Sequence, residues 1–175
     1  MTKKKEKILN AALALFAEEG FTATSTSKIA KKAGVSEGLI FRHFENKDGL
    51  LNAILKEGEE KAKILFADVV TETEPKEAIR KTLELGLKMN QNKELAEFWK
   101  LQYKIKWELE EYGEHKMEVV KKALTQAFDA LGYKQADMEA EHLLILLDGL
   151  ATRFYLQASF DVEKTIQFVL KKYGI

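Results

Sequence analysis

The scarcity of proline most constrains what this chain can fold into, because Pro75 is the only proline in 175 residues. Apolar residues instead recur at three- and four-residue spacing over long stretches, beginning with Leu9, Ala12, Leu13 and Phe16. This is the periodicity of one face of an α-helix. With few residues that break helices, the pattern predicts an all-α protein.

Breaks in the apolar periodicity divide the chain into helices. Gly20 is expected to end the first helix in a left-handed conformation, with Phe21 folding back on the last turn. Asn46 is a favourable N-cap for a long helix, and Pro75 suits the first turn of the next one. The expected helices cover approximately residues 4–19, 26–33, 36–44, 46–70, 75–89, 94–112, 114–131, 136–159 and 161–173.

One stretch, LQYKIKWEL at residues 101–109, also fits a β-strand, because its apolar and polar residues alternate. The same residues form two stripes on a helix, one containing Leu101 and Ile105 and the other Tyr103 and Trp107. A lone strand would have no partner elsewhere in the sequence. We therefore expect a helix with apolar surroundings on two sides.

The composition restricts the class of protein. With 46% hydrophobic and 32% charged residues, the chain is too apolar to be disordered and too charged for a membrane protein. It has no cysteine, and its N-terminus lacks the apolar core of a signal peptide, so we expect a soluble cytoplasmic protein. The 28 basic and 28 acidic residues balance, but residues 1–50 carry a mild positive excess that permits an anionic partner.

The segment KIAKKAGVSEGLIFRHF, residues 28–44, has the features of a helix-turn-helix. Ile29 and Ala33 lie on the inner face of a short helix, Gly34 permits a tight turn, and Val35 fills the space between two helices. Ser36 can cap the second helix. Such a pair of helices lays its second member in the DNA major groove. The spacing alone fits a helical hairpin in a plain bundle equally well.

The sequence of this segment resembles the DNA-binding head of the tetracycline-repressor (TetR) family of bacterial regulators. The resemblance covers about 45 residues, whereas the remaining 130 resemble the family only in helix number and length. It implies a helix-turn-helix head in residues 1–46 and a helical ligand-binding and dimerisation domain in residues 47–175. The matching positions are Gly20-Phe21, Thr24-Ser25, Ile29-Ala30, Ala33-Gly34-Val35-Ser36, Gly38, Ile40, Phe44 and Lys47.

The resemblance implies contacts to DNA phosphates and base edges. Arg42 can bind guanine in a bidentate manner, and Glu37 can accept from cytosine or instead favour its own helix dipole. Lys28 is either a phosphate contact or a solvated surface lysine. Phe41 departs from the family, which usually has a tyrosine there that reaches a phosphate. The predicted DNA-binding residues are Ser25, Thr26, Lys28, Ser36, Glu37, Gly38, Leu39, Phe41, Arg42, His43 and Lys47.

The segment 143–156 is apolar on almost every side and therefore must be buried on every side. One monomer covers one side, and a second copy is the simplest cover for the other. The resemblance implies the same arrangement, a four-helix dimer interface formed by the last two helices of each subunit. The predicted interface residues are Leu143, Leu146, Gly149, Leu150, Arg153, Phe154 and Phe168.

The middle helices are rich in aromatic residues and methionine. These residues either fill a core or line a pocket for a small molecule, as helical bundles often do. In the TetR family the body typically binds an effector that shifts the heads relative to the DNA grooves. The predicted ligand-binding residues are Met89, Phe98, Trp99, Tyr103, Trp107, Met117 and Phe128.

The predicted function is a ligand-responsive regulator, in most cases of this family a repressor, that binds a palindromic DNA operator as a homodimer. An enzyme is the first alternative, because Glu139 and His142 have the spacing of a di-iron ligand pair, but no second pair exists. We therefore expect no metal, cofactor or catalysis. The second alternative is a dimeric helical interaction protein that has lost specific DNA binding.

Overall fold

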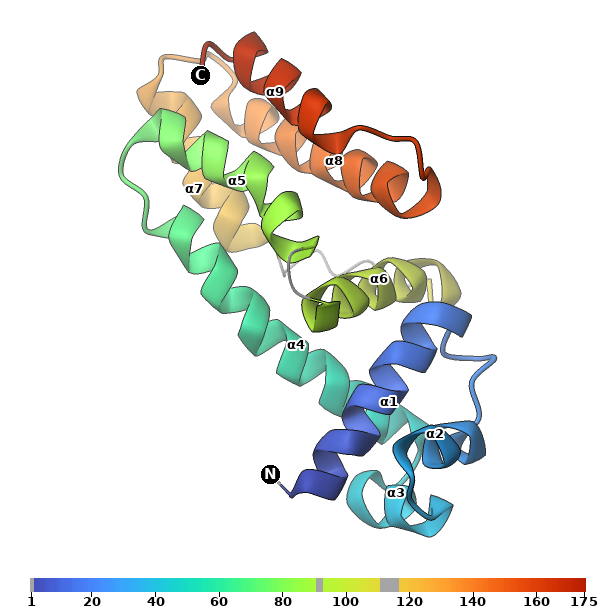
Figure 1. Cartoon of the computed structure of the whole chain (residues 1–175). Coiled ribbons are helices and arrows are strands. Elements are labelled where there is room, and N and C mark those ends of the chain that lie inside the picture. Colours follow the sequence, from blue (N-terminus) through green and yellow to red (C-terminus); the bar gives the residue numbers. More distant parts are fainter. Residues whose placement is uncertain (1, 91–92, 111–116) are drawn as a thin grey trace. The chain divides into compact units, whose positions relative to one another are not determined.

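The computed structural model describes residues 2–90, 93–110 and 117–175, which form helices and loops without any strand (Figure 1). This confirms the all-α prediction. The chain divides into two compact units, residues 1–62 with 92–112 and residues 63–91 with 113–175. The long helix α4 (Lys47–Val70) contributes to both. This division is spatial, so the proposed functional boundary after residue 46 stays a prediction.

The first unit combines the N-terminal helices with a helix from the middle of the chain. It contains α1 (Lys3–Glu19), α2 (Thr26–Ala33), α3 (Glu37–Phe44), the first part of α4, and α6 (Lys93–Glu108), which packs against α1. Phe98, Leu101 and Ile105 of α6 are buried in the same apolar core as Phe16 and Leu50.

Helix α6 resolves the ambiguity of residues 101–109 in favour of a helix. Its Phe98, Leu101 and Ile105 stripe is buried as expected. The second stripe differs, because Trp99 is half-buried while the side chain of Trp107 is 85% exposed. The helix also ends at Glu108, earlier than the expected residue 112, and residues 111–112 lie outside the described part of the chain.

Two glycines of α4 allow close approaches that a side chain would block. A Cβ atom at Gly49 would lie 2.1 Å from the carbonyl oxygen of Phe44, so α4 begins directly against the end of α3. A Cβ atom at Gly58 would lie 2.0 Å from the ring of Phe98. The second contact lets α6 pack tightly on α4.

The second unit contains the end of α4 with α5 (Pro75–Asn90), α7 (Glu118–Ala130), α8 (Ala136–Leu156) and α9 (Val162–Lys172). Its core includes Phe128, whose ring contacts those of Tyr133 and Tyr173 at centroid distances of 5.2 and 5.4 Å. The hydroxyl of Tyr173 also donates to Glu139 at 3.1 Å and lies 3.3 Å from the Nδ1 atom of His142. Glu139 and His142 therefore tie the end of α9 to α8.

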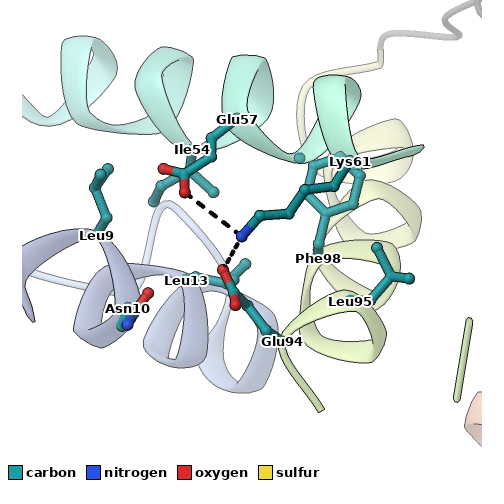
Figure 2. Close-up of a pocket in the computed structure, with 10 residues that line it drawn as sticks. Leu9, Asn10, Leu13, Ile54, Glu57, Lys61, Glu94, Leu95 and Phe98 are labelled. Carbon is teal, nitrogen blue, oxygen red and sulfur yellow. Dashed lines mark hydrogen bonds and ion pairs between the residues drawn. The ribbon is translucent and has the colours of Figure 1, made fainter. Parts of the chain in front are cut away.

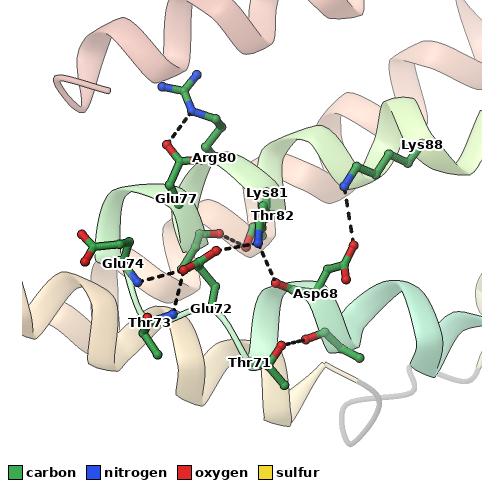
Figure 3. A network of polar contacts seen from close by, with 12 residues as sticks. Asp68, Thr71, Glu72, Thr73, Glu74, Glu77, Arg80, Lys81, Thr82 and Lys88 are labelled. Atoms are coloured by element: carbon green, nitrogen blue, oxygen red, sulfur yellow. Dashed lines mark hydrogen bonds and ion pairs between the residues drawn. The ribbon is translucent and has the colours of Figure 1, made fainter.

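The loop between α4 and α5 is closed by its own charged residues (Figure 3). The carboxylate of Glu72 accepts the amide N–H groups of Thr73 and Glu74, at 2.8 and 3.0 Å, and the ammonium of Lys81. Lys81 also donates to the carbonyl oxygen of Asp68. The hydrogen bond from Lys81, with those from the two amides, lowers the pKa of Glu72 to about 2.

The C-terminal helices end close to the expected positions. Helix α8 stops at Leu156 rather than at 159, because Gln157 adopts an extended conformation. Asp161 then caps α9 by accepting the amide N–H of Lys164 at 2.9 Å. No helix among the described residues has the length and apolar character needed to cross a bilayer.

Candidate nucleic-acid interface

Helices α2 and α3 form the expected helix-turn-helix geometry. The hydroxyl of Ser25 accepts the amide N–H of Lys28 at 3.2 Å and caps α2. Gly34 adopts a left-handed conformation with φ of 68°, and the amide of Val35 donates to Ala30 at 3.0 Å. The turn that the sequence predicted around Gly34 is therefore present.

The start of α3 differs from expectation. Ser36 has the extended backbone of an N-cap, but its exposed hydroxyl forms no capping hydrogen bond. Glu37 instead accepts a hydrogen bond from the hydroxyl of Thr26, which joins the starts of the two helices. The carboxylate predicted to read cytosine thus already has a structural partner.

The outward side of α3 presents a continuous surface. Ser36, Gly38 and Arg42 are exposed, and the ring of Phe41 is 45% exposed. Leu39 and His43 are half-buried, and the ring of His43 contacts that of Phe44. Ile40 and Phe44 face the core, so the helix separates a packed side from a side available to a partner.

Both predicted phosphate-binding lysines have partners within the protein. The ammonium of Lys28 contacts both carboxylate oxygens of Glu19 at 2.6 Å. The ammonium of Lys47 donates to the carbonyl oxygens of Phe21 and Thr24, at 3.0 and 3.2 Å, and lies 4.3 Å from the centre of the Phe21 ring. Lys47 therefore organises the loop between α1 and α2, and its contact with phosphate stays a prediction.

Glu108 holds the same loop from α6, a role that sequence reasoning missed. Its carboxylate accepts the amide N–H of Phe21 at 3.0 Å and that of Thr22. Desolvation alone would raise the pKa of Glu108, but the hydrogen bonds from Thr22 and Phe21 outweigh it and hold the pKa below its usual range. No local pattern links positions 86 and 87 residues apart. The expected helix end at residue 112 also placed Glu108 inside the helix rather than at its terminus.

Comparison with known proteins identifies the head. Residues 8–54 match the model of a family described as bacterial regulatory proteins, tetR family. The head therefore matches the TetR family. The matching segment includes α2, the turn and α3, which is where the sequence resemblance was found.

Relatives with similar sequences align with about a third of this chain. YvkB of Bacillus subtilis (strain 168), described as an uncharacterized HTH-type transcriptional regulator, is 47% identical over 57 residues, covering 33% of this chain and 30% of YvkB. The fatty acid metabolism regulator protein of the same strain is 42% identical over 60 residues, covering 33% of this chain and 31% of that protein. The chain thus spans about a third of the length of these curated relatives.

Solved structures share the fold over almost the whole chain. A protein from Saccharomonospora viridis in complex with choline superposes with a TM-score of 0.80 at 20% identity, covering 99% of this chain and 96% of that one. The fatty acid degradation regulator FadR from Bacillus halodurans gives a TM-score of 0.70 at 20% identity, covering 98% and 94%. At this identity the similarity establishes the fold.

The predicted ligand-binding residues fall into both compact units. Phe98, Trp99, Tyr103 and Trp107 lie on α6 in the first unit, where the rings of Phe98 and Trp99 are in contact. Met117 and Phe128 belong to the second unit, and Phe128 is fully buried in its core. The side chain of Met89 lies outside the described part of the structure.

Phe98 also lines a small cleft between α1, α4 and α6 (Figure 2). The ammonium of Lys61 lies at its rim between the carboxylates of Glu57 and Glu94. Desolvation lowers the pKa of Lys61, but the hydrogen bond and charge of Glu94, helped by Glu57, outweigh it and raise the pKa above its usual value. The cleft has room for about one water molecule, so it is too small for an organic effector.

The predicted dimer residues divide between the core and the surface. Leu143 and Leu150 are buried in the core of their own protomer. Leu146 and Phe154 are partly exposed, whereas Gly149, Arg153 and Phe168 lie on the surface. Sequence reasoning missed a stripe of exposed apolar residues on α8. A helical projection of the segment would have shown that these residues lie on a different side of the helix from the buried ones. The stripe consists of Met138, Ile145 and Leu156, in line with Gly149.

Proposed function

We propose that this chain is a ligand-responsive transcriptional regulator, most simply a repressor, that binds a palindromic operator as a homodimer and is released by a small, largely apolar effector. The observation that carries this proposal is the helix-turn-helix, with Ser25 capping α2 and an exposed outer side on α3. The proposed functional parts are a DNA-binding head in residues 1–46 and a ligand-binding and dimerisation domain in residues 47–175.

The chemistry of the head supports DNA as the partner. The first amides of α2 have no acceptor within the helix and favour an anion, and the exposed hydroxyl of Ser25 stands beside them. Arg42 is exposed on α3 and matches the edge of guanine. A Cβ atom at Gly38 would meet no atom within 4 Å, so this position faces open space and allows close approach of the DNA backbone or a base.

The exposed apolar residues of α8 and α9 support a homodimer. Ile145 and Leu156 on α8 are 62% and 82% exposed, Phe168 on α9 is 69% exposed, and exposed large apolar groups that form a patch mark a protein interface. Gly149 lies in line with Ile145 and Leu156 and permits two helices to cross closely. We expect light scattering to give twice the monomer mass of 20.0 kDa.

The nature of the effector is inferred from similar proteins. One structural relative was solved with choline, and two regulators similar in sequence or fold are named for fatty acids. A fatty acid suits the mostly apolar predicted ligand residues of this chain, and the cation of choline suits their aromatic rings, so these two compounds are the first probes to use. A true effector must weaken operator binding, and the operator must weaken effector binding by the same factor, typically about 5 to 150-fold.

Selection of bound sequences from a random DNA pool tests the proposal directly. We expect a palindrome with two half-sites, and the Arg42→Ala variant to lose preference at one position in each half-site, at a cost of about 1–3 kcal/mol per contact. Arg80→Ala is the matched control, because it removes the same charge from α5, where Arg80 pairs with Glu77. Enrichment of no sequence would instead favour a dimeric interaction protein that has lost specific DNA binding.

A further inference from the structure

The loop between α1 and α2 is held on two sides by charged side chains of other helices. Lys47, at the start of α4, binds three carbonyl oxygens of the loop, those of Phe21, Thr22 and Thr24. Glu108, at the end of α6, binds the amides of Phe21 and Thr22. The positive charge of Lys47 therefore binds carbonyl groups of the loop, and the negative charge of Glu108 binds its amide groups. We call this pair of residues the loop clamp.

The backbone groups of this loop have few other partners. The amide of Thr24 donates to the carbonyl of Phe21, and its buried hydroxyl donates to the carbonyl of Gly20 at 2.7 Å. Lys104, one turn before Glu108, donates to the carbonyl of Glu18 at the end of α1. The end of α6 thus contacts the end of α1 and the beginning of the loop together.

We infer that Glu108 is a positioning residue for DNA binding: its carboxylate fixes the loop between α1 and α2, and this sets the position of the amides and hydroxyl at the start of α2. The inference rests on the proposed function, because its consequence is specific affinity for an operator. Ser25, the cap of α2, follows directly after Thr24, whose carbonyl Lys47 holds. A loop released from Glu108 leaves α2 attached to the core but with its first turn free to shift.

Simple electrostatics and positioning predict opposite effects of removing this carboxylate. DNA is a polyanion, so loss of a negative charge from the head should tighten binding to every sequence. Loss of a positioning group should weaken binding to the operator, because two loop amides lose their acceptor. The sign of the change therefore separates the two roles.

The experiment compares Glu108→Ala and Glu108→Gln with wild type, using operator obtained by selection and a non-specific duplex. We expect Glu108→Ala to weaken operator binding roughly tenfold, which corresponds to about 1.4 kcal/mol, without weakening non-specific binding. The operator affinity of Glu108→Gln should lie between those of wild type and Glu108→Ala, since the amide oxygen of the glutamine still accepts one N–H group. Glu110→Gln is the control, because it removes an exposed carboxylate two residues away.

Hydrogen exchange at the amides of Phe21 and Thr22 provides the second readout, and both should lose protection in Glu108→Ala. Unchanged or tighter operator binding by both Glu108 variants would overturn the inference and leave the proposed function intact. If the wild type selects no DNA sequence, the proposed function fails and the role of Glu108 in DNA binding fails with it. In that case hydrogen exchange tests only whether Glu108 holds the loop, and unchanged protection of the two amides in Glu108→Ala would exclude this. If Glu108→Ala does not fold, Glu108→Gln supplies both measurements.

Discussion

Two loops of this protein are each held by a lysine and a glutamate. In one loop these residues are close in sequence to the groups they bind, and in the other they are far away in sequence. In the loop between α4 and α5, Glu72 binds adjacent amides and Lys81, nine residues away. In the loop between α1 and α2, Lys47 and Glu108 lie more than 20 and more than 80 residues from their backbone partners. The first loop is completed by its own sequence, whereas the second is completed only when α4 and α6 have packed.

This difference has a consequence for the head. Helices α1 to α3 form a recognisable sequence motif, yet their connecting loop lacks its full set of hydrogen bonds without α6. Buried or partly buried backbone groups that lose a partner cost more than the partner contributed. The loop of this helix-turn-helix head is therefore completed by a helix that lies outside the segment matched by the family model.

The largest effect on stability should come from removing the lysine of the loop clamp. Lys47→Met keeps the length of the side chain but removes three hydrogen bonds to carbonyl groups and the contact with the Phe21 ring. We expect the free energy of unfolding to fall by about 2–3 kcal/mol, as is typical when charged hydrogen bonds are lost. Urea unfolding followed by tryptophan fluorescence measures this, because Trp99 and Trp107 both lie in the first unit.

Lys81→Met is the matched variant for the local loop. Its ammonium binds one carboxylate and one carbonyl, whereas that of Lys47 binds three carbonyls and an aromatic ring, and partly exposed ion pairs contribute little, so its removal should cost clearly less. If Lys47→Met and Lys81→Met lowered the free energy of unfolding equally, the distance of the partners along the chain would not matter. The proposed difference between the two loops would then be wrong.

A second variant moves α6 without touching the loop. In Gly58→Ala, the new methyl group would overlap the Phe98 ring, so α6 or the ring must shift, at a cost of about 2 kcal/mol. If α6 shifts, the amides of Phe21 and Thr22 should exchange faster although Glu108 is unchanged. Gly86→Ala on α5 is the control, because its methyl group meets no atom within 4 Å and should stabilise the helix by about 0.5–1 kcal/mol. Unchanged exchange in Gly58→Ala would show that the ring alone moves.

Most of the fold could be predicted from sequence because its signals are local. The apolar periodicity located the helices, Gly34 marked the turn, and Ser25 and Asn46 were recognised as caps, with Asn46 accepting the amide of Gly49 at 2.7 Å. Helix ends were less certain, as α6 shows, because the apolar pattern continues beyond the last helical residue. The placement of α6 beside α1 had no local signal at all.

The candidate site was predicted less completely, because a side chain's partner depends on the folded structure. Sequence identified Lys28, Glu37 and Lys47 as charged groups of the head, but not that each has a partner within the protein. Glu108 escaped notice because its partners are backbone amides, which no residue type reveals. Leu143 and Leu150 were correctly recognised as buried positions, but sequence did not show that their own protomer covers them.

The smallest expected effect is a pH dependence of stability that tests the loop between α4 and α5. Because the pKa of Glu72 is lowered to about 2 from an ordinary value of 4.5, its ionised form stabilises the folded chain above about pH 4.5. This contribution should fade as the pH falls towards 2, where the folded state also binds the proton. Urea unfolding followed by circular dichroism, repeated from pH 7 to pH 2, should show wild type more stable than Glu72→Gln at neutral pH and the two converging in acid. In Lys81→Met the same substitution should have a smaller effect, because the hydrogen bond from Lys81 is the main cause of the lowered pKa. If the wild-type and Glu72→Gln curves instead stay parallel down to pH 2, the carboxylate is not held by the loop, and the α4–α5 loop is not closed by its own charges.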